Sequence, residues 1–163
     1  MADSTVAGYL LPTDTIPNDV ALEDILQGVV VGITGLPGRY VIPRWQEDPP
    51  PMPPVNVDWC AIGSIDFDTE GTASIEHLPD ADTWLGTDEL TQWETFDVIA
   101  SFYGPDSQSY AARFRDGLQI GQNREAMWVN ANMVFRSAAR VENRPDVRNE
   151  QWVRRYDVRC TFA

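Results

Sequence analysis

The chain has 163 residues and a formal net charge of −13, and each of its 12 basic residues is an arginine. Without a lysine it lacks the phosphate-binding residue of a Walker A loop and the amine of a Schiff base, which excludes P-loop NTPases and pyridoxal enzymes. The negative charge opposes tight binding to DNA or to an anionic membrane. Length and composition predict one soluble domain over residues 1–163.

The charge is divided unevenly along the chain. Residues 1–106 hold 19 carboxylates and two arginines, a net charge of −17, whereas residues 107–163 hold 6 carboxylates and 10 arginines, a net charge of +4. This division predicts an acidic and a basic patch, which would suit head-to-tail association of identical copies. The alternative is that both sets of charges are simply solvated.

The first 17 residues are expected to form an irregular N-terminal arm, because Pro12 and Pro17 interrupt them. A helix follows, for which Asn18 has N-cap character and Gly35 is a typical end signal. The apolar residues at near-helical spacing are Val20, Ile25, Leu26, Val29 and Ile33. These residues are the predicted buried stripe.

A short β-rich run, Tyr40–Ile42, comes next, and six of the 12 prolines lie between Pro43 and Pro54. Such a segment cannot pair inside a sheet and favours an extended, polyproline-like backbone. Residues 45–56 are therefore expected to form a proline-rich loop packed on the same particle. A polyproline ligand for another domain is the alternative.

Strands are expected in the middle of the chain. Val57–Phe67 alternates in polarity, and Thr69–Gly71 signals a turn into a hairpin partner at Thr72–Ile75. Gln92–Tyr103 gives the clearest strand pattern. One face of that strand carries Phe96, Val98, Ala100 and Phe102.

The last third of the chain predicts two helices and two strands. After Gly104–Asp106, Tyr110, Phe114 and Leu118 recur at helical spacing. A second short helix is expected at about 124–130 and strands at 133–141 and 152–162. The mostly apolar face of the final strand comprises Trp152, Arg154, Tyr156, Val158, Cys160 and Phe162. This order predicts an α+β fold with a mostly antiparallel sheet and helices packed on one face.

Metal-binding patterns are weak. Asp66–Gly71 is similar to the opening of a calcium loop, but His77 stands where the closing glutamate should be. Cys60 and Cys160 lie in strand-like patterns and are expected to be reduced core thiols. We therefore expect no metal and no cofactor.

Catalytic patterns are also weak. The acidic pairs Asp80/Asp82 and Asp88/Glu89 could serve a small hydrolase, which needs two carboxylates of different pKa. Acidic loop residues are common in so acidic a chain, and no nucleophile-elbow motif accompanies His77. The sequence therefore favours a protein without enzymatic activity.

The arginines of the C-terminal region crowd two predicted strands and the loop between them. A planar guanidinium suits bidentate pairing with carboxylates, so this cluster is interpreted as a protein interface rather than a nucleic-acid surface. The candidate subunit or partner interface residues are Arg44, Trp45, Glu47, Asp48, Met52, Arg136, Arg140, Arg148, Arg155, Asp157 and Arg159.

Several segments resemble a bacteriophage neck or tail-terminator protein family over about residues 20–163. They are ITGLP at 33–37, VIPRWQ at 41–46, DWCAIG at 58–63, SFYGP at 101–105, RDGL at 115–118 with QN at 122–123, and NEQWVRRYDV at 149–158. These motifs are structural rather than catalytic.

The resemblance implies a structural virion protein that forms a ring, usually a hexamer, on the last ring of the tail tube. Its partners would be its own copies, the tail tube protein and the head-side connector protein, with the tail sheath as a further candidate. DNA would pass through without specific binding, and the subunit would be in the host cytoplasm during assembly. A stopper or adaptor ring of the head–tail connector is the alternative role.

Overall fold

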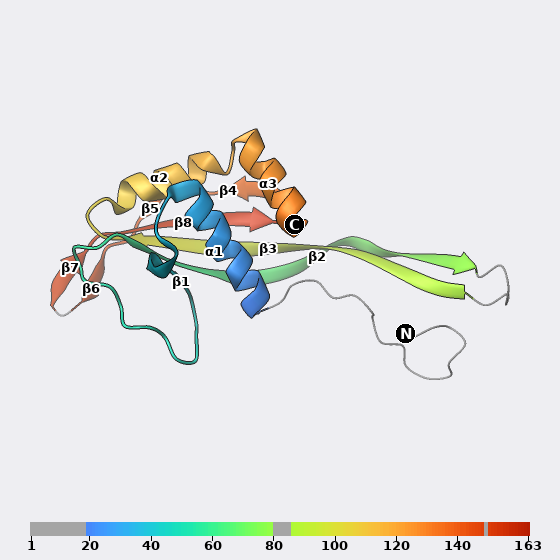
Figure 1. Ribbon diagram of the computed structural model, residues 1–163, viewed down its shortest axis with the longest axis horizontal. Helices are drawn as coiled ribbons and strands as arrows, with labels where there is room; N and C mark the ends of the chain where they lie inside the picture. Colours follow the sequence, from blue (N-terminus) through green and yellow to red (C-terminus); the bar gives the residue numbers. More distant parts are fainter. Residues whose placement is uncertain (1–18, 80–85, 149) are drawn as a thin grey trace. The chain divides into compact units, whose positions relative to one another are not determined.

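The computed structural model describes residues 19–79, 86–148 and 150–163 (Figure 1). The described residues fall into two compact units, one with residues 68–79 and 86–94 and the other with residues 19–67 and 95–163. The predicted N-terminal arm, 1–17, and the predicted cap, Asn18, lie outside the described residues. The extent of a single domain over 1–163 stays a prediction.

The elements follow one another in the order helix, strands, two helices and strands. They are α1 (Val20–Thr34), the 3-10 turn η1 (Gly38–Tyr40), β1 (Val41–Pro43), β2 (Trp59–Pro79), β3 (Gly86–Tyr103), α2 (Ser107–Gly117), α3 (Gly121–Ala131), β4 (Phe135–Ala138), β5 (Glu142–Asn143), β6 (Asp146–Arg148), β7 (Gln151–Val153) and β8 (Arg155–Phe162).

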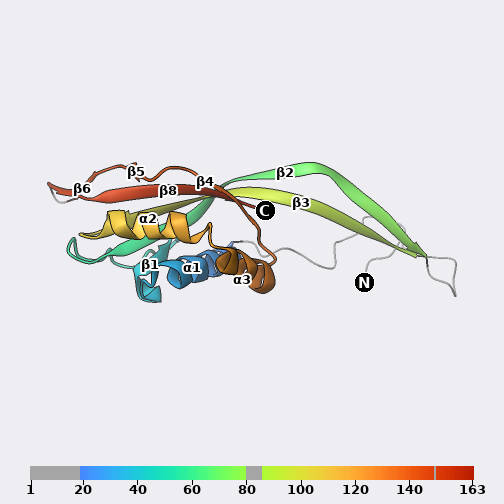
Figure 2. The same cartoon turned by 90° about the horizontal axis from the view of Figure 1, so that it is seen from above.

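The main sheet has the strand order β1-β2-β3-β8-β4, and β5 also pairs with β8. β8 is antiparallel to β3, β4 and β5, whereas β1 is parallel to β2. In the larger unit the three helices cover one face of this sheet (Figure 2). The predicted α+β fold, with a mostly antiparallel sheet and helices on one face, is therefore confirmed.

The core lies between this sheet and the helices. The register places Phe96 opposite Phe162, Val98 opposite Cys160 and Ala100 opposite Val158. The side chains of Val98, Ala100, Val158 and Phe162 are fully buried. Alternation along a strand sends every second side chain to the same face, so the predicted apolar face of β3 is confirmed.

The helix α1 is confirmed, but its predicted buried stripe is wrong in part. The buried residues are Leu22, Leu26, Val30 and Thr34, which follow one another at intervals of four. Val20 is 69% exposed. The helix carries more apolar residues than one face can bury, so periodicity alone does not select the face. Gly35 ends the helix as predicted, in the left-handed conformation with φ of 78°.

The predicted turn at Thr69–Gly71 is wrong, because β2 continues through it to Pro79 and pairs with β3. Local turn chemistry is nevertheless present: the Thr69 amide donates to Asp68 Oδ1 at 2.8 Å, and Gly71 has φ of 76°. Pairing between long strands overrides these local signals. β3 likewise begins at Gly86, earlier than the predicted start at residue 92.

Both helices after β3 are confirmed. Phe114 and Leu118 of the predicted stripe are fully buried, and Tyr110 packs at the edge of the core. Gly117 lies against Ile33 of α1, where a Cβ atom would collide with the isoleucine side chain. This glycine therefore allows the close approach of α1 and α2.

The predicted final strand is two strands, because the chain leaves the main sheet before Arg155. β7 pairs with β6 in a separate hairpin, with Val147 opposite Trp152. Trp152 is 76% exposed, so its predicted place on the apolar face is wrong. The predicted strand at 133–141 is shorter than expected, ending at Ala138.

A second, smaller cluster lies on the sheet face opposite the helices. Trp59, Ala61, Tyr103 and Val153 are buried there, with Tyr40 and Ile42 at the margin. The rings of Trp59 and Tyr103 stack with centroids 4.3 Å apart and an interplanar angle of 8°. This cluster positions the polar groups described below.

Leu26→Ala is expected to lower the free energy of unfolding by about 2–5 kcal/mol, because it opens a cavity in the core. Val20→Ala on the exposed side of the same helix is the matched control and should change it by less than about 0.5 kcal/mol. Urea unfolding followed by circular dichroism measures both. Equal losses in the two variants would contradict the assigned buried face.

The two cysteine thiols are expected to be unreactive while the chain is folded. Both are free and buried, and burial raises the pKa of Cys160 to about 12 and raises that of Cys60 as well. The thiolate is the reactive form. At pH 8 an aromatic disulfide reagent should therefore label neither thiol in the folded protein and both in urea. Rapid labelling without denaturant would contradict the burial.

Candidate subunit interface and its buried anchor

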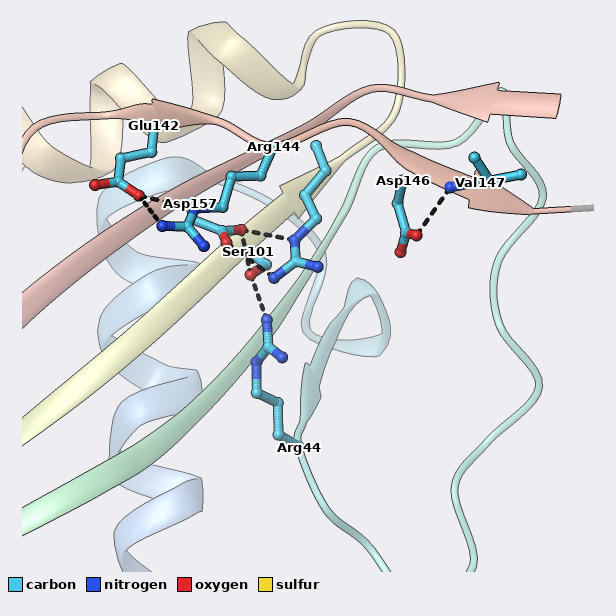
Figure 3. Close-up of polar contacts among 8 residues, drawn as sticks. Arg44, Ser101, Glu142, Arg144, Asp146, Val147 and Asp157 are labelled. Carbon is cyan, nitrogen blue, oxygen red and sulfur yellow. Dashed lines mark hydrogen bonds and ion pairs between the residues drawn. The ribbon is translucent and has the colours of Figure 1, made fainter.

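The carboxylate of Asp157 in β8 is buried, at 3% exposed, and lies at the centre of a hydrogen-bonded network. It accepts two hydrogen bonds from Arg155, Nε to Oδ1 and Nη2 to Oδ2, each of 2.8 Å. The hydroxyl of Ser101 in β3 donates a third at 2.5 Å (Figure 3). Residues 155 and 157 share a strand face, and Ser101 is the register partner of Asp157, so pairing brings the three together.

Arg44 joins the same network from the other side of β2. Its backbone N–H donates to the Ile62 carbonyl at 2.8 Å, which extends the pairing of β1 with β2. Its guanidinium donates to the Ser101 hydroxyl (Figure 3). At Gly63 a Cβ atom would lie 3.1 Å from Cβ of Arg44 and 2.8 Å from Cζ3 of Trp45. The glycine therefore makes room for both side chains over β2.

This network is an anchor rather than a reaction centre. Asp157 and Arg155 form a bidentate ion pair, and the hydrogen bond from Arg155 to Asp157 raises the pKa of the arginine. Arg155 also lies 5.7 Å from the centroid of the Tyr103 ring, whose pKa burial raises. A buried carboxylate is stable only when its oxygens are paired, and here all donors come from positions that the sheet fixes.

A second group of charges lies at the solvent-exposed edge of the sheet. Glu142, the register partner of Asp157 in β5, accepts a hydrogen bond from Arg144 Nε at 2.8 Å (Figure 3). That hydrogen bond lowers the pKa of Glu142. Arg140 Nε lies 3.7 Å from the same carboxylate, and the Arg140 side chain is 87% exposed. These exposed pairs are screened by water and contribute little to stability.

The structure divides the predicted interface arginines into two groups. Arg44 and Arg155 are held in the buried network. Arg136, Arg140 and Arg159 are exposed at or beside β4 and β8. The predicted clustering on adjacent strands is therefore present, but only the second group is exposed at the surface. Reversing the charge of Arg159 would probe an interface more cleanly than reversing that of Arg155.

Arg148 in β6 belongs to neither the buried nor the exposed group of arginines. It is half-buried, and its Nη1 atom is buried without a hydrogen-bond partner among the described residues. Asp157 is buried and is not accessible at the subunit surface. Whether any of these residues contacts another chain stays a prediction.

The proline-rich segment lacks helix and strand between Pro43 and Trp59. Trp45 is 67% exposed and Met52 is 62% exposed, and Glu47 and Asp48 lie on the surface. The guanidinium of Arg44 lies 5.9 Å from the Trp45 ring centroid. These four loop residues are accessible to a partner.

The hairpin of β6 and β7 was not foreseen from the sequence. Val147 and Trp152 are paired across it and are 54% and 76% exposed. Val153 on the same hairpin is buried against Trp59 and Tyr103. The alternation of a buried Val153 with an exposed Trp152 is the sequence signal for this hairpin. It can be used only once the interruption of the final strand is recognised.

The described residues give no support to catalysis by a carboxylate pair. Asp80 and Asp82 lie outside the described residues. Asp88 pairs with His77, Oδ1 to Nδ1 at 2.7 Å, and Glu89 follows it on the opposite face of β3. Asp88 and Glu89 therefore do not lie side by side on one face of the strand.

The described residues contain no group of three or more His, Cys, Asp or Glu side chains placed to hold a metal ion. No helix within residues 19–79, 86–148 and 150–163 has the length and apolar character needed to span a membrane.

The sequence was compared with protein families and with curated proteins. A family model described as phage neck terminator protein matches residues 20–163. The match therefore covers both compact units of the described structure. No curated protein matches the sequence.

Asp157→Ala is expected to lower the free energy of unfolding by about 3–5 kcal/mol, because it leaves the half-buried Arg155 charge and the Ser101 hydroxyl without their acceptor. Glu142→Ala on the neighbouring strand is the control, and it should have a much smaller effect because water solvates its arginine partners. Urea unfolding measures both. Equal stability of the two variants would contradict the anchoring role of Asp157.

Proposed function

The chain belongs to the phage neck terminator protein family, and on that premise we propose that it forms a ring that closes the end of the tail tube. The family is one of structural proteins of the phage neck, and the match over residues 20–163 carries the proposal. The protein is accordingly a neck component of the virion. A ring of about six copies is proposed, built from one repeated heterologous contact.

The charge distribution supports a ring. A heterologous contact needs two different and complementary patches on each subunit. The exposed arginines Arg136, Arg140 and Arg159 supply a cationic patch, and the described part of the N-terminal region carries most of the carboxylates. Complementary charges of this kind set the orientation and the rate of association between subunits.

The proposed partners are the tail tube protein on one side of the ring and the head-side connector protein on the other. The tail sheath is a further candidate in a contractile tail. Residues 45–56 suit such a contact, because prolines lose little conformational entropy on binding and Trp45 and Met52 are exposed. Their neighbours Glu47 and Asp48 would add charge to that contact.

DNA is proposed to pass through the ring without being bound. The net charge of −13 repels a polyanion, which favours sliding over retention. The subunit is proposed to fold and assemble in the host cytoplasm before it enters the virion.

Mixing the purified chain with purified tail tube protein is expected to give particles that contain about six copies, each of 18.3 kDa, because the tube end templates the ring. Light scattering coupled to gel filtration measures the mass. A chain that stays monomeric with the tube protein would contradict the proposal.

Electron micrographs of virions with a labelled subunit provide the second readout. A label at the top of the tail tube is expected. A label on the head side of the neck, with binding to the connector but not to the tube, would instead assign the chain to a connector ring.

A further inference from the structure

The smaller unit is a two-stranded ribbon made by residues 68–79 of β2 and 86–94 of β3. Its described residues are exposed or half-exposed apart from Gly86. The exposed large apolar side chains are Ile75 at 70%, Leu78 at 44%, Leu90 at 64% and Trp93 at 50%. A lone two-stranded ribbon is only marginally stable in water, and grouped apolar side chains on a surface mark a contact site.

The two faces of the ribbon differ in chemistry. His77 and Asp88 are bonded across it, so they share a face, and alternation adds Ile75 and Leu90 to that face. Gly86 belongs there too, because a Cβ atom on it would meet the His77 ring. By the same alternation the opposite face carries Glu76, Leu78, Glu89 and Trp93. The first face therefore combines Ile75 and Leu90 with the His77–Asp88 pair, and the second, the acidic face, combines two carboxylates with a leucine and a tryptophan.

The charge of the ribbon limits what can bind it. The ribbon contains six carboxylates, no arginine and one histidine, a net charge of −6 with the histidine neutral. The carboxylates are Asp68, Glu70, Glu76, Asp88, Glu89 and Glu94. Nucleic acid and anionic lipid would be repelled. The partner must present cations, with apolar surface between them.

The chain itself carries such a surface. The helices cover one face of the main sheet, and β8 turns Arg159 to the other face beside its register partner Ile99. Arg159 is exposed, and after Arg144 and Arg140 it is a further cation that lowers the pKa of Glu142. Arg136 and Arg140 are exposed at β4 and just beyond it. Arg155 is paired with Asp157, whereas Arg144 and Arg140 share the one carboxylate of Glu142, so this face keeps an excess of positive charge.

From this complementarity we infer that the acidic face of the ribbon binds the arginine-bearing outer face of β8 and β4 in a second copy of the chain. Glu76 and Glu89 pair with Arg159 and Arg140 of the neighbour, and Leu78 packs near Ile99. The inference rests on the proposed ring and names the contact that repeats around it. Ion pairs at an interface are strengthened when neighbouring apolar groups exclude water.

The double variant Glu76→Arg, Glu89→Arg tests the contact in the full chain. Like charges would then face each other, and subunit association should weaken on the order of 100-fold. Adding Arg140→Glu and Arg159→Glu to the same chain should restore most of the association, as expected for a direct pair. Sedimentation velocity with the tail tube protein present measures the ring fraction, and circular dichroism confirms that each variant is folded.

The matched control is Asp24→Arg, Glu125→Arg, which makes the same change in net charge at exposed positions of α1 and α3. It should form rings like the unaltered chain. Normal rings from the ribbon variant would overturn the inferred contact and leave the proposed function standing. If the ribbon variant forms normal rings that no longer bind the tail tube, the ribbon contacts the tube protein and not a second copy of the chain. Failure of the unaltered chain to form rings would overturn the proposed function itself.

Discussion

The buried carboxylate of Asp157 is the constraint on which the larger unit depends. Its oxygens must be paired inside the protein, and the donors come from Arg155 on its own strand and Ser101 on the next. A slip of one residue between β3 and β8 would turn Asp157 toward the apolar core. The network therefore fixes the register of the central strands, and Arg44 extends it to the segment after β1.

The same network explains why the arginines do not form one class. Arg155 lies two residues before Asp157 on the same strand face. Its charge is therefore neutralised within the subunit by an ion pair with that carboxylate. Arg159 follows two residues later and is exposed, and the residue two positions beyond it is Thr161 rather than a carboxylate. A sheet can thus present charge on one face while it neutralises charge beside it. This division supplies a cationic surface in a chain whose net charge is −13.

The α+β class and the apolar face of β3 could be predicted because Val98, Ala100 and Phe102 alternate regularly with residues of other character. The buried face of α1 could not, since both Leu22 and Val20 lie on a helix rich in apolar residues. The predicted turn at Gly71 and the predicted burial of Trp152 were wrong for another reason, because strand pairing decides the structure at both positions. For the interface, charge counting found the arginine cluster, whereas the spacing of Arg155 and Asp157 was the missed signal for their internal pairing.

The position of β8 in the sheet affects the order of events during synthesis. β8 lies between β3 and β4, yet it is translated after both. A nascent chain that has not reached β8 therefore lacks the strand through which β3 and β4 are joined in the sheet. Ribosomal elongation takes seconds for a chain of this length, roughly 5–20 residues per second. The proposed contact through Arg159 therefore needs β8, which emerges after all the other described strands.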